Sequence, residues 1–381
     1  MIPKENYHSR PVFEREIRTL FQAGFQFAAL TTELANDRDF VCVDYFGTAI
    51  VVQNFKGKIK AFQNVCAHRF NRIQTEERGN RALTCMYHGW TYDETGFPAG
   101  MPKRAQFLSQ DGDNAALCLT RYEVEICGIF VFVAPVPVKT DLRSQLGKFY
   151  EVLEELSQHI GHETHYSNVP HKANWKLIVE NVIECYHCPT VHQDTFMFYG
   201  FGKAEMQDLV IDGSHSSCHF PREEAVNEDL MRRGLSHLNG RSLKHRSYYH
   251  IYVFPNLFVS STQGTSFFVG QLLPVSEEET MLRIRYFEPK MEWKPWYRTR
   301  QDLINVETVE VGLRLVEEDR SILENIQKGM RLSDRPGILG DDEVRIAAFA
   351  KQYKDMMARD PELPPSAAVS EPLGAAPGAF G

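Results

Sequence analysis

Two short cysteine–histidine motifs constrain this chain of 381 residues more than any other feature of its sequence. Cys66 and His68 form a C-x-H motif, and after sixteen further residues Cys85 and His88 form a C-x-x-H motif. Zinc fingers usually group a cysteine pair and then a histidine pair, whereas these residue types alternate. If each motif gives one ligand of each type, one metal ion can bind both thiolates and a second metal ion both imidazoles. A structural zinc site and four unrelated core residues remain the alternatives.

The segment around these motifs is predicted to be rich in β-strands. Between residues 39 and 135, β-branched and aromatic runs such as FVCVDYF and TAIVVQNF are separated by Gly, Asn and Asp. The motifs then lie on two turns, as is typical of a Rieske [2Fe–2S] centre, in which imidazoles replace two thiolates on one iron and raise the reduction potential. The motifs and the following HGWTYDETGFP resemble a Rieske domain. Phe70 stands where many relatives have glycine.

A second candidate metal site lies in the sequence ENVIECYHCPTVH. Residues 174–188 are predicted to be helical, which would place Glu184 and His187 on one face because they are three positions apart. His192 is five positions after His187, and Pro189 between them should end or kink the helix and bring His192 back. Two imidazoles, a carboxylate and open positions form the facial triad of non-haem Fe(II) oxygenases. For His187 and for His192, the alternative is an ordinary core or surface histidine that binds no metal.

The third ligand of that iron is expected from a long helix at about 297–330. One face of this helix carries an apolar stripe with a single acidic residue, Asp319. Burying a carboxylate is costly unless it is paired or binds a metal, so Asp319 is the candidate ligand and a buried salt bridge is the alternative. Glu317 and Glu318 are expected to be solvated. The stripe consists of Val311, Leu315, Asp319, Ile322, Ile326 and Met330.

The periodicity of the chain predicts an α+β protein with two main domains. Residues 11–30 and 143–160 are predicted helices, and strands return at about 205–290. We expect an N-terminal helical segment at 1–38 that packs on the catalytic domain, a Rieske domain at 39–150, a catalytic domain at 151–360 and a flexible tail at 361–381.

Composition and charge argue against several classes of partner. The net charge of −8 disfavours nucleic acid and anionic membrane surfaces, since both attract basic proteins. The sequence has no apolar run long enough to span a membrane and no apolar N-terminal signal, so we expect a cytoplasmic protein. Eight cysteines are too sparse in so long a chain for a disulfide scaffold, and we expect reduced thiols.

Taken together, the motifs resemble the oxygenase (α) subunit of the Rieske non-haem iron oxygenases over nearly the whole chain. NWKLIVENVIECYHC…H and VEEDRSILENIQKGM are similar to its iron-binding helix and its late carboxylate helix. The resemblance implies a Rieske β-sandwich and a helix-grip (START-like) catalytic domain with an antiparallel sheet and a long C-terminal helix. It implies as ligands Cys66, His68, Cys85 and His88 for the cluster, and His187, His192 and Asp319 for mononuclear Fe(II).

The resemblance also implies how electrons reach the iron. Glu184, at a position that is commonly Asp, would link His187 to a cluster histidine, by analogy His88, of the neighbouring subunit in a head-to-tail homotrimer or a multiple of it. A separate reductase or ferredoxin would donate the electrons, because the chain lacks G-x-G-x-x-G and plant-type ferredoxin motifs. Dioxygen would be activated at the iron for insertion into a C–H bond or an arene.

Two substrate classes suit the sequence. Aromatic residues in 194–202 and 248–261 suit either an arene or, through cation–π contacts, a quaternary ammonium group. Hydroxylation of an aromatic or aromatic-acid substrate is the first prediction, and hydroxylation with oxidative N-demethylation of a betaine- or carnitine-like compound is the second. Arg232 and Arg233 are candidates for binding a carboxylate. An electron carrier without catalytic iron and a zinc-stabilised binding module are the alternatives from other functional classes.

Overall fold

The computed structural model describes residues 1–359 with several gaps, and the chain forms two compact units. Met1–Thr31 and Glu125–Met357 make up the first unit, and the second contains Thr32–Val124. The residues left undescribed are 46, 109–113, 136, 203, 225, 227, 229–246, 292–294 and 360–381. The expected tail at 361–381 and the candidates Arg232 and Arg233 therefore lie outside the described residues.

Antiparallel strands form the frame of the second unit, in the order β6-β4-β3-β2-β5. The first cysteine–histidine motif follows β4 and the second follows β5. Cys66, Cys85, Phe62 and Trp90 belong to the same apolar core, so the strands and the motif loops are packed together. The strands are β2 (Asp39–Tyr45), β3 (Thr48–Phe55), β4 (Lys58–Gln63), β5 (Arg78–Asn80) and β6 (Arg121–Cys127), with short helices at Thr31–Leu34, Arg104–Gln106 and Ala115–Leu117.

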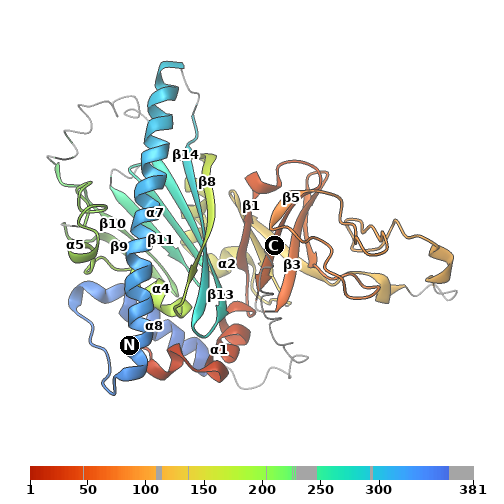
Figure 1. Cartoon of the computed structure of the whole chain (residues 1–381), viewed down its shortest axis with the longest axis horizontal. Coiled ribbons are helices and arrows are strands. Elements are labelled where there is room, and N and C mark those ends of the chain that lie inside the picture. Colours follow the sequence, from red (N-terminus) through yellow and green to blue (C-terminus); the bar gives the residue numbers. More distant parts are fainter. Residues whose placement is uncertain are drawn as a thin grey trace, which may run out of the picture. The chain divides into compact units, whose positions relative to one another are not determined.

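The first unit is built on a large antiparallel sheet with the strand order β8-β14-β13-β12-β11-β10-β9. The long helix α7 (Pro295–Leu332) follows β14 and packs against β8, β14 and helix α4 (Trp175–Val182) (Figure 1). A sheet that holds a long C-terminal helix confirms the predicted helix-grip architecture. The strands are β8 (Ile160–His171), β9 (Gln207–Asp212), β10 (His215–Phe220), β11 (Tyr248–Val253), β12 (Leu257–Thr262), β13 (Ser266–Ser276) and β14 (Glu279–Pro289).

The N-terminal segment contains a strand where the sequence predicted helix throughout residues 11–30. Helix α1 (Arg10–Glu16) continues as a π-helical turn to Phe21, and β1 (Gln26–Leu30) pairs with β7 (Phe130–Ala134). All side chains of β1 are buried, and a short apolar run enclosed on both faces suits a strand better than a one-sided helix. The remaining helices are α2 (Leu142–Leu146), α3 (Phe149–Ser157), α5 (Cys188–Val191) and α8 (Val344–Ala358), with short turns at Lys4–Tyr7 and Asp341–Glu343.

Two other helix predictions differ from the structure in detail. The predicted helix at 143–160 is split at Gly147, whose φ of 54° is a left-handed conformation that glycine adopts readily. The buried face of α7 is offset from the predicted stripe, because Ile322 and Ile326 are each 39% exposed. Gln327 is buried instead, where it bonds the backbone of Tyr7 and Asn174.

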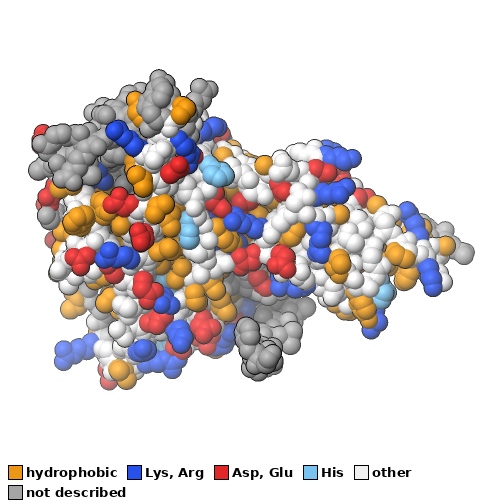
Figure 2. Space-filling view, turned by 45° about the horizontal axis from the view of Figure 1, so that its top comes forward, with side chains coloured by type: hydrophobic (Ala, Val, Ile, Leu, Met, Phe, Trp, Pro, Cys, Tyr) orange, Lys and Arg blue, Asp and Glu red, His pale blue; other side chains and the backbone are white. Residues whose placement is uncertain are grey.

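The surface carries charges of both signs. On the face in Figure 2, acidic and basic side chains are interspersed and no large area has a single sign. This distribution agrees with the modest net charge of −8. Among the described helices, none combines the length and the hydropathy that a membrane span requires.

One buried carboxylate joins three helices of the first unit. Glu16 Oε1 on α1 lies 2.7 Å from Lys176 Nζ on α4, and both side chains are fully buried. Trp175 Nε1 donates to Glu16 Oε2 at 2.9 Å, and the hydroxyl of Tyr353 on α8 donates to Oε1. Burial lowers the pKa of Lys176, and the charge of Glu16 opposes that shift. The N-terminal segment is thus held to α4 and α8 by a compensated ion pair.

Replacing Glu16 with glutamine is expected to lower the free energy of unfolding by about 3–5 kcal/mol, because the buried Lys176 would lose the carboxylate to which it is directly bonded. Urea unfolding followed by circular dichroism measures the change. Glu14→Gln is the matched control, since Glu14 lies on the same helix but pairs with the partly exposed Arg10, and its loss should be below about 1 kcal/mol. Equal small losses in the two variants would contradict this role of Glu16.

Candidate metal centres

The two cysteine–histidine motifs lie on loops with matching backbone conformations. In each loop the amide four residues after the cysteine donates to the cysteine carbonyl, from Phe70 to Cys66 at 3.0 Å and from Gly89 to Cys85 at 2.9 Å. Phe70 (φ 61°) and Gly89 (φ 73°) both have the left-handed conformation that favours glycine. Phe70 therefore occupies a glycine-like backbone position, and its side chain is 82% exposed.

The structure brings the four predicted cluster residues together. His68 Nδ1 lies 3.1 Å from His88 Nδ1, and the thiols of Cys66 and Cys85 adjoin one another. Both cysteines are buried, whereas His88 is exposed. The hydroxyl of Tyr92 accepts a hydrogen bond from the Ala67 amide and lies 3.1 Å from Cys66 Sγ, to which it can donate. Paired imidazoles and paired thiols are the grouping that the alternating motifs predicted.

The chemistry of these donors fits a Rieske cluster. Burial raises the pKa of the Cys66 thiol, and a bound metal reverses that effect because cysteine binds metals as thiolate. Burial, His88 and Arg69 lower the pKa of His68, which favours the neutral imidazole that binds metals. The hydroxyl of Tyr92 near Cys66 Sγ supplies the kind of hydrogen bond to sulfur that tunes cluster potentials.

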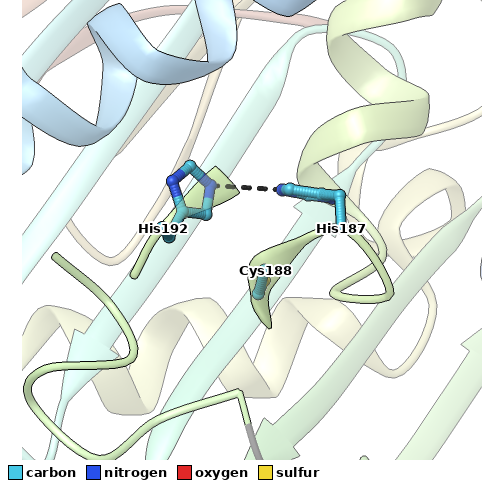
Figure 3. Close-up of side chains that lie close together, drawn as sticks. All are labelled: His187, Cys188 and His192. Carbon is cyan, nitrogen blue, oxygen red and sulfur yellow. Dashed lines mark hydrogen bonds between the residues drawn. The ribbon is translucent and has the colours of Figure 1, made fainter. Parts of the chain in front are cut away.

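The second group of predicted ligands converges from the chain after α4, from α5 and from α7. His187 Nε2 lies 3.2 Å from His192 Nε2 (Figure 3). Asp319 Oδ1 lies 3.1 Å from His192 Nε2 and 3.6 Å from His187 Nε2. Ligand atoms that are about 2.1 Å from one ion are about 3.0–3.4 Å apart at octahedral or tetrahedral angles. Two of the three separations fall in this range, and the separation of Asp319 Oδ1 from His187 Nε2 exceeds it by about 0.2 Å. The three atoms thus surround one position, and two imidazoles with a carboxylate are the donor set of a facial triad.

The chain reaches this arrangement by a different local structure from the predicted one. Helix α4 ends at Val182, His187 lies in the irregular segment that follows, and Pro189 is in the first turn of α5. Proline is tolerated there because the first amides of a helix have no intrahelical partner. Pro189 thus helps to begin a new short helix instead of kinking a long one, and His192 at the end of α5 faces His187.

A carboxylate holds the outer nitrogen of each imidazole in this second centre. Glu184 accepts a hydrogen bond from His187 Nδ1, and Glu318 accepts one from His192 Nδ1 at 2.8 Å. Each ring then directs Nε2 towards the other ligands, as is usual for metal-binding histidines. The expectation that Glu318 is solvated is wrong, because it also accepts from Thr195 Oγ1 at 2.7 Å. Glu317 is exposed, as expected.

The second centre attracts positive charge. Burial alone would lower the pKa of His192, but hydrogen bonds to Asp319 and Glu318, and the charges of both, raise it. Asn181 on α4, to which the sequence assigned no role, donates from Nδ2 to Asp319 Oδ1 at 3.3 Å. Its own Oδ1 is buried without a partner in the described part of the chain. One feature of the sequence could have pointed to Asn181: it is the single amide within the mostly apolar run WKLIVENVI.

Two cysteines beside this centre form a disulfide, contrary to the expectation of reduced thiols. Cys185 is bonded to Cys188, while the other six cysteines are free. Cys188 lies with His187 and His192 in one group of potential metal-binding side chains (Figure 3). A disulfide sulfur is not a thiolate, so Asp319 is the better third donor.

A cavity of about 510 Å³ opens onto the second centre. His187, His192 and Asp319 line one part of it, and aromatic side chains line much of the rest. The rings of Phe196, Phe201 and Tyr248 are 5.0–5.8 Å apart and form one cluster, which we call the aromatic cluster. A largely apolar cavity of this size suits a small organic molecule.

Comparison with known protein families covers both centres. Residues 24–123 match the Rieske [2Fe-2S] domain, and residues 153–359 match the catalytic domain of the ring hydroxylating alpha subunit. These are the domains that carry a Rieske cluster and a mononuclear iron, respectively.

Curated relatives include oxygenase subunits of two kinds. The chain is 33% identical over 241 residues to the glycine betaine monooxygenase oxygenase subunit of Chromohalobacter salexigens, which covers 62% of this chain and 50% of that protein. It is 30% identical over 242 residues to the carnitine monooxygenase oxygenase subunit of Escherichia coli K12, a match that covers 57% of this chain and 64% of that protein. It is 31% identical over 233 residues to the anthranilate 1,2-dioxygenase large subunit of Burkholderia cepacia, a match that covers 56% of this chain and 54% of that protein. The chain thus spans about half to two thirds of the length of these relatives.

Solved structures share the fold of the whole chain. The quaternary ammonium Rieske monooxygenase CntA in complex with L-carnitine has a TM-score of 0.73 at 22% identity, covering 93% of this chain and 95% of that chain. Naphthalene 1,2-dioxygenase with indole bound has a TM-score of 0.74 at 19% identity, covering 93% and 92%. With its Rieske domain and its ring-hydroxylating catalytic domain, the chain belongs to the Rieske non-haem iron oxygenases, as an oxygenase (α) subunit.

Proposed function

We propose that the chain is the terminal oxygenase component that hydroxylates a quaternary ammonium compound of the betaine or carnitine type, using O2 and electrons from a separate NAD(P)H-dependent reductase or ferredoxin. Hydroxylation of an N-methyl group gives a product that releases the methyl carbon as formaldehyde. The observation that carries the proposal is the presence of both the aromatic cluster and the carboxylate of Glu307 in the wall of the cavity that reaches Asp319. The betaine and carnitine relatives support this substrate class, which the sequence had placed second to aromatic compounds.

The wall of the cavity has the features that a quaternary ammonium group requires. Such a group has no N–H to donate, so it binds through the faces of aromatic rings and through nearby negative charge. The aromatic cluster supplies the rings, and Tyr199 and Glu307 lie in the same wall, joined by a hydrogen bond from the Tyr199 hydroxyl. A carboxylate beside aromatic faces favours a cation.

Other residues of the catalytic unit orient ligands and exclude water. Bound iron would supply the activation of dioxygen. Glu184 and Glu318 accept the Nδ1 protons of His187 and His192, which keeps both rings oriented with Nε2 towards the centre. Apolar side chains of α7, including Val311 and Leu315, complete the cavity wall and limit the access of bulk water.

Hydroxylation of an aromatic acid is the second candidate. The anthranilate dioxygenase relative supports it, and a planar ring also suits a cavity lined by Phe196, Phe201 and Leu315. The products separate the two candidates, because only oxidative N-demethylation releases formaldehyde.

With a surrogate reductase and NADH, the protein is expected to convert glycine betaine with the release of one formaldehyde per NADH consumed. Anthranilate and benzoate, assayed side by side, should consume little NADH and give no hydroxylated product. Formaldehyde is measured by derivatisation and ring products by chromatography. A hydroxylated aromatic acid, formed while glycine betaine is left unchanged, would reverse the order of the two candidates.

Asp319→Ala is expected to reduce the iron content by about one atom per chain and to leave the visible spectrum of the cluster unchanged, because a [2Fe–2S] cluster holds the other two atoms. Metal analysis of the purified protein checks this. Glu317→Ala is the matched control, since Glu317 lies on the same helix but is exposed and pairs with Arg320. Full iron content in the Asp319 variant would refute the assignment of the third ligand.

Exposed apolar side chains lie near both centres and support assembly into a head-to-tail homotrimer or a multiple of it. Phe70, Met86 and Tyr87, on the loops that carry the cluster histidines, are 82%, 69% and 54% exposed. Tyr186, two residues after Glu184, is 72% exposed. Exposed apolar groups of this kind mark interaction sites. In the trimer Glu184 would bridge to His88 of the neighbouring subunit.

The double variant Phe70→Ser/Tyr87→Ser is expected to shift the protein from trimer towards monomer, because it removes two apolar contacts from each subunit boundary. Size-exclusion chromatography with light scattering measures the mass. Leu332→Ser/Ile338→Ser is the control, since these side chains are 86% and 92% exposed but lie after the catalytic centre on the chain. An unchanged mass in the first variant, or an equal shift in the control, would count against this interface.

A further inference from the structure

Arg222 is a cation built into the wall of the cavity. It follows β10 by two residues and lines the cavity together with Phe201 and Phe220. The centre of its guanidinium group lies 4.3 Å from the centroid of the Phe201 ring, and Nη1 donates to Gln263 Oε1 at 2.7 Å. Arg222 thus lies over the ring of Phe201, which leaves Phe196 and Tyr248 as the rings of the aromatic cluster that can bind an ammonium group. The charge of Arg222 remains available to another part of the ligand.

No acidic group compensates Arg222 in the part of the chain that the structure describes. Its hydrogen-bond partner Gln263 is neutral, and Nε is buried without a partner. Burial lowers the pKa of Arg222 to about 10 and no neighbouring charge offsets it, so the side chain is still protonated near neutral pH. The buried Lys176, in contrast, has Glu16 as its counter-ion.

The surrounding chain fixes Arg222 in place. Gly200 has a φ of 79°, and a Cβ there would lie 3.2 Å from Cγ of Arg222, so the two segments are in close contact. The amide of Glu223 donates to the Gly200 carbonyl at 2.8 Å. The aliphatic part of Arg222 is therefore packed against the segment that carries Phe196 and Phe201. A guanidinium group held in this way loses little side-chain entropy when it binds an anion.

A second donor in the same wall also lacks an acceptor. Arg345 Nη1 donates to His250 Nδ1 at 3.1 Å, which places the ring proton of neutral His250 on Nε2. That Nε2 is buried without a partner in the described part of the chain, and His250 lines the cavity. Unpaired buried donors are costly, so the wall is set up for a ligand that brings hydrogen-bond acceptors.

We propose that Arg222 binds the carboxylate of the substrate, so that the substrates of this enzyme are carboxylates and not simple ammonium alcohols or unsubstituted arenes. This inference rests on the proposed function where it takes the substrate to carry a quaternary ammonium group as well. Glu307, in the same wall, accepts a hydrogen bond from Tyr199, whereas Arg222 donates to Gln263, so the cavity has an acidic and a basic group with different partners. That polarity matches a zwitterion such as a betaine. Arg222 takes the role that the sequence assigned to Arg232 and Arg233.

Binding calorimetry on the iron-loaded, oxidised full chain tests the inference with two pairs of probes. Glycine betaine and choline share the quaternary ammonium group, but only the first is a carboxylate. Benzoate and benzyl alcohol form the corresponding aromatic pair. The variants are Arg222→Gln, which removes the charge, and Arg222→Lys, which keeps it. Arg300→Gln is the matched control, because Arg300 also lines the cavity but is exposed. Thermal unfolding confirms that each variant is folded.

The wild type is expected to bind glycine betaine at least about 30-fold more tightly than choline, and Arg222→Gln should remove most of this preference, since loss of one partner of a buried charge pair has an effect of that size. Arg222→Lys should keep part of the preference and Arg300→Gln nearly all of it. The aromatic pair separates the two hypotheses. If benzoate binds through Arg222 and glycine betaine does not bind, the role of Arg222 as an anion site is supported and the proposed quaternary ammonium substrate is contradicted.

Three results would overturn the role of Arg222. The first is a wild type that binds choline as tightly as glycine betaine and benzyl alcohol as tightly as benzoate. The second is an Arg222→Gln variant that is folded and keeps the full preference for carboxylates, or a preference that is lost in Arg300→Gln instead. The third is a wild type that binds none of the four probes.

Discussion

The catalytic unit is organised around the buried carboxylate of Asp319. Asp319, on α7, is only 9% exposed, and a carboxylate at that depth needs positive charge or several hydrogen-bond donors nearby. His192 lies 3.1 Å away and Asn181 donates at 3.3 Å. These partners come from segments more than a hundred residues earlier in the chain, so α7 has to pack across the sheet to meet them. The packing of α7 that produces the helix-grip fold is therefore also the packing that assembles the candidate iron site.

The two centres use opposite nitrogens of their histidines, and this difference decides which part of each ring is free. His68 and His88 approach one another through Nδ1, which leaves Nε2 on the outer edge of partly and fully exposed rings. His187 and His192 approach through Nε2, which leaves Nδ1 for Glu184 and Glu318. With a cluster bound, the first arrangement would give an electron a short way to the surface. The second places the candidate metal ligands between carboxylates and an apolar cavity.

The sequence was most informative where the relevant residues are close together in the chain. The candidate ligand motifs at 66–88 and 184–192 stood out by their spacing and Asp319 by its isolation among apolar residues, and the structure brings each group together. Glu318 and Asn181 could not be assigned, because their roles depend on contacts across 126 and 138 residues. Likewise, residues 26–30 form a strand only because β7 pairs with them. A single arginine such as Arg222 has no distinctive pattern in the sequence. Arg232 and Arg233 were candidates for binding a carboxylate only because two adjacent positive charges are easy to recognise.

The matching left-handed turns at Phe70 and Gly89 separate two properties of the cluster domain. The backbone of each turn sets where sulfur and nitrogen atoms lie, and the side chain at its tip faces solvent. A new residue at position 70 that tolerates the left-handed conformation alters what the domain presents to a neighbouring subunit and leaves the ligand-bearing backbone as it is. Contacts between neighbouring subunits can therefore diverge among such chains while the positions of the candidate ligand atoms stay the same.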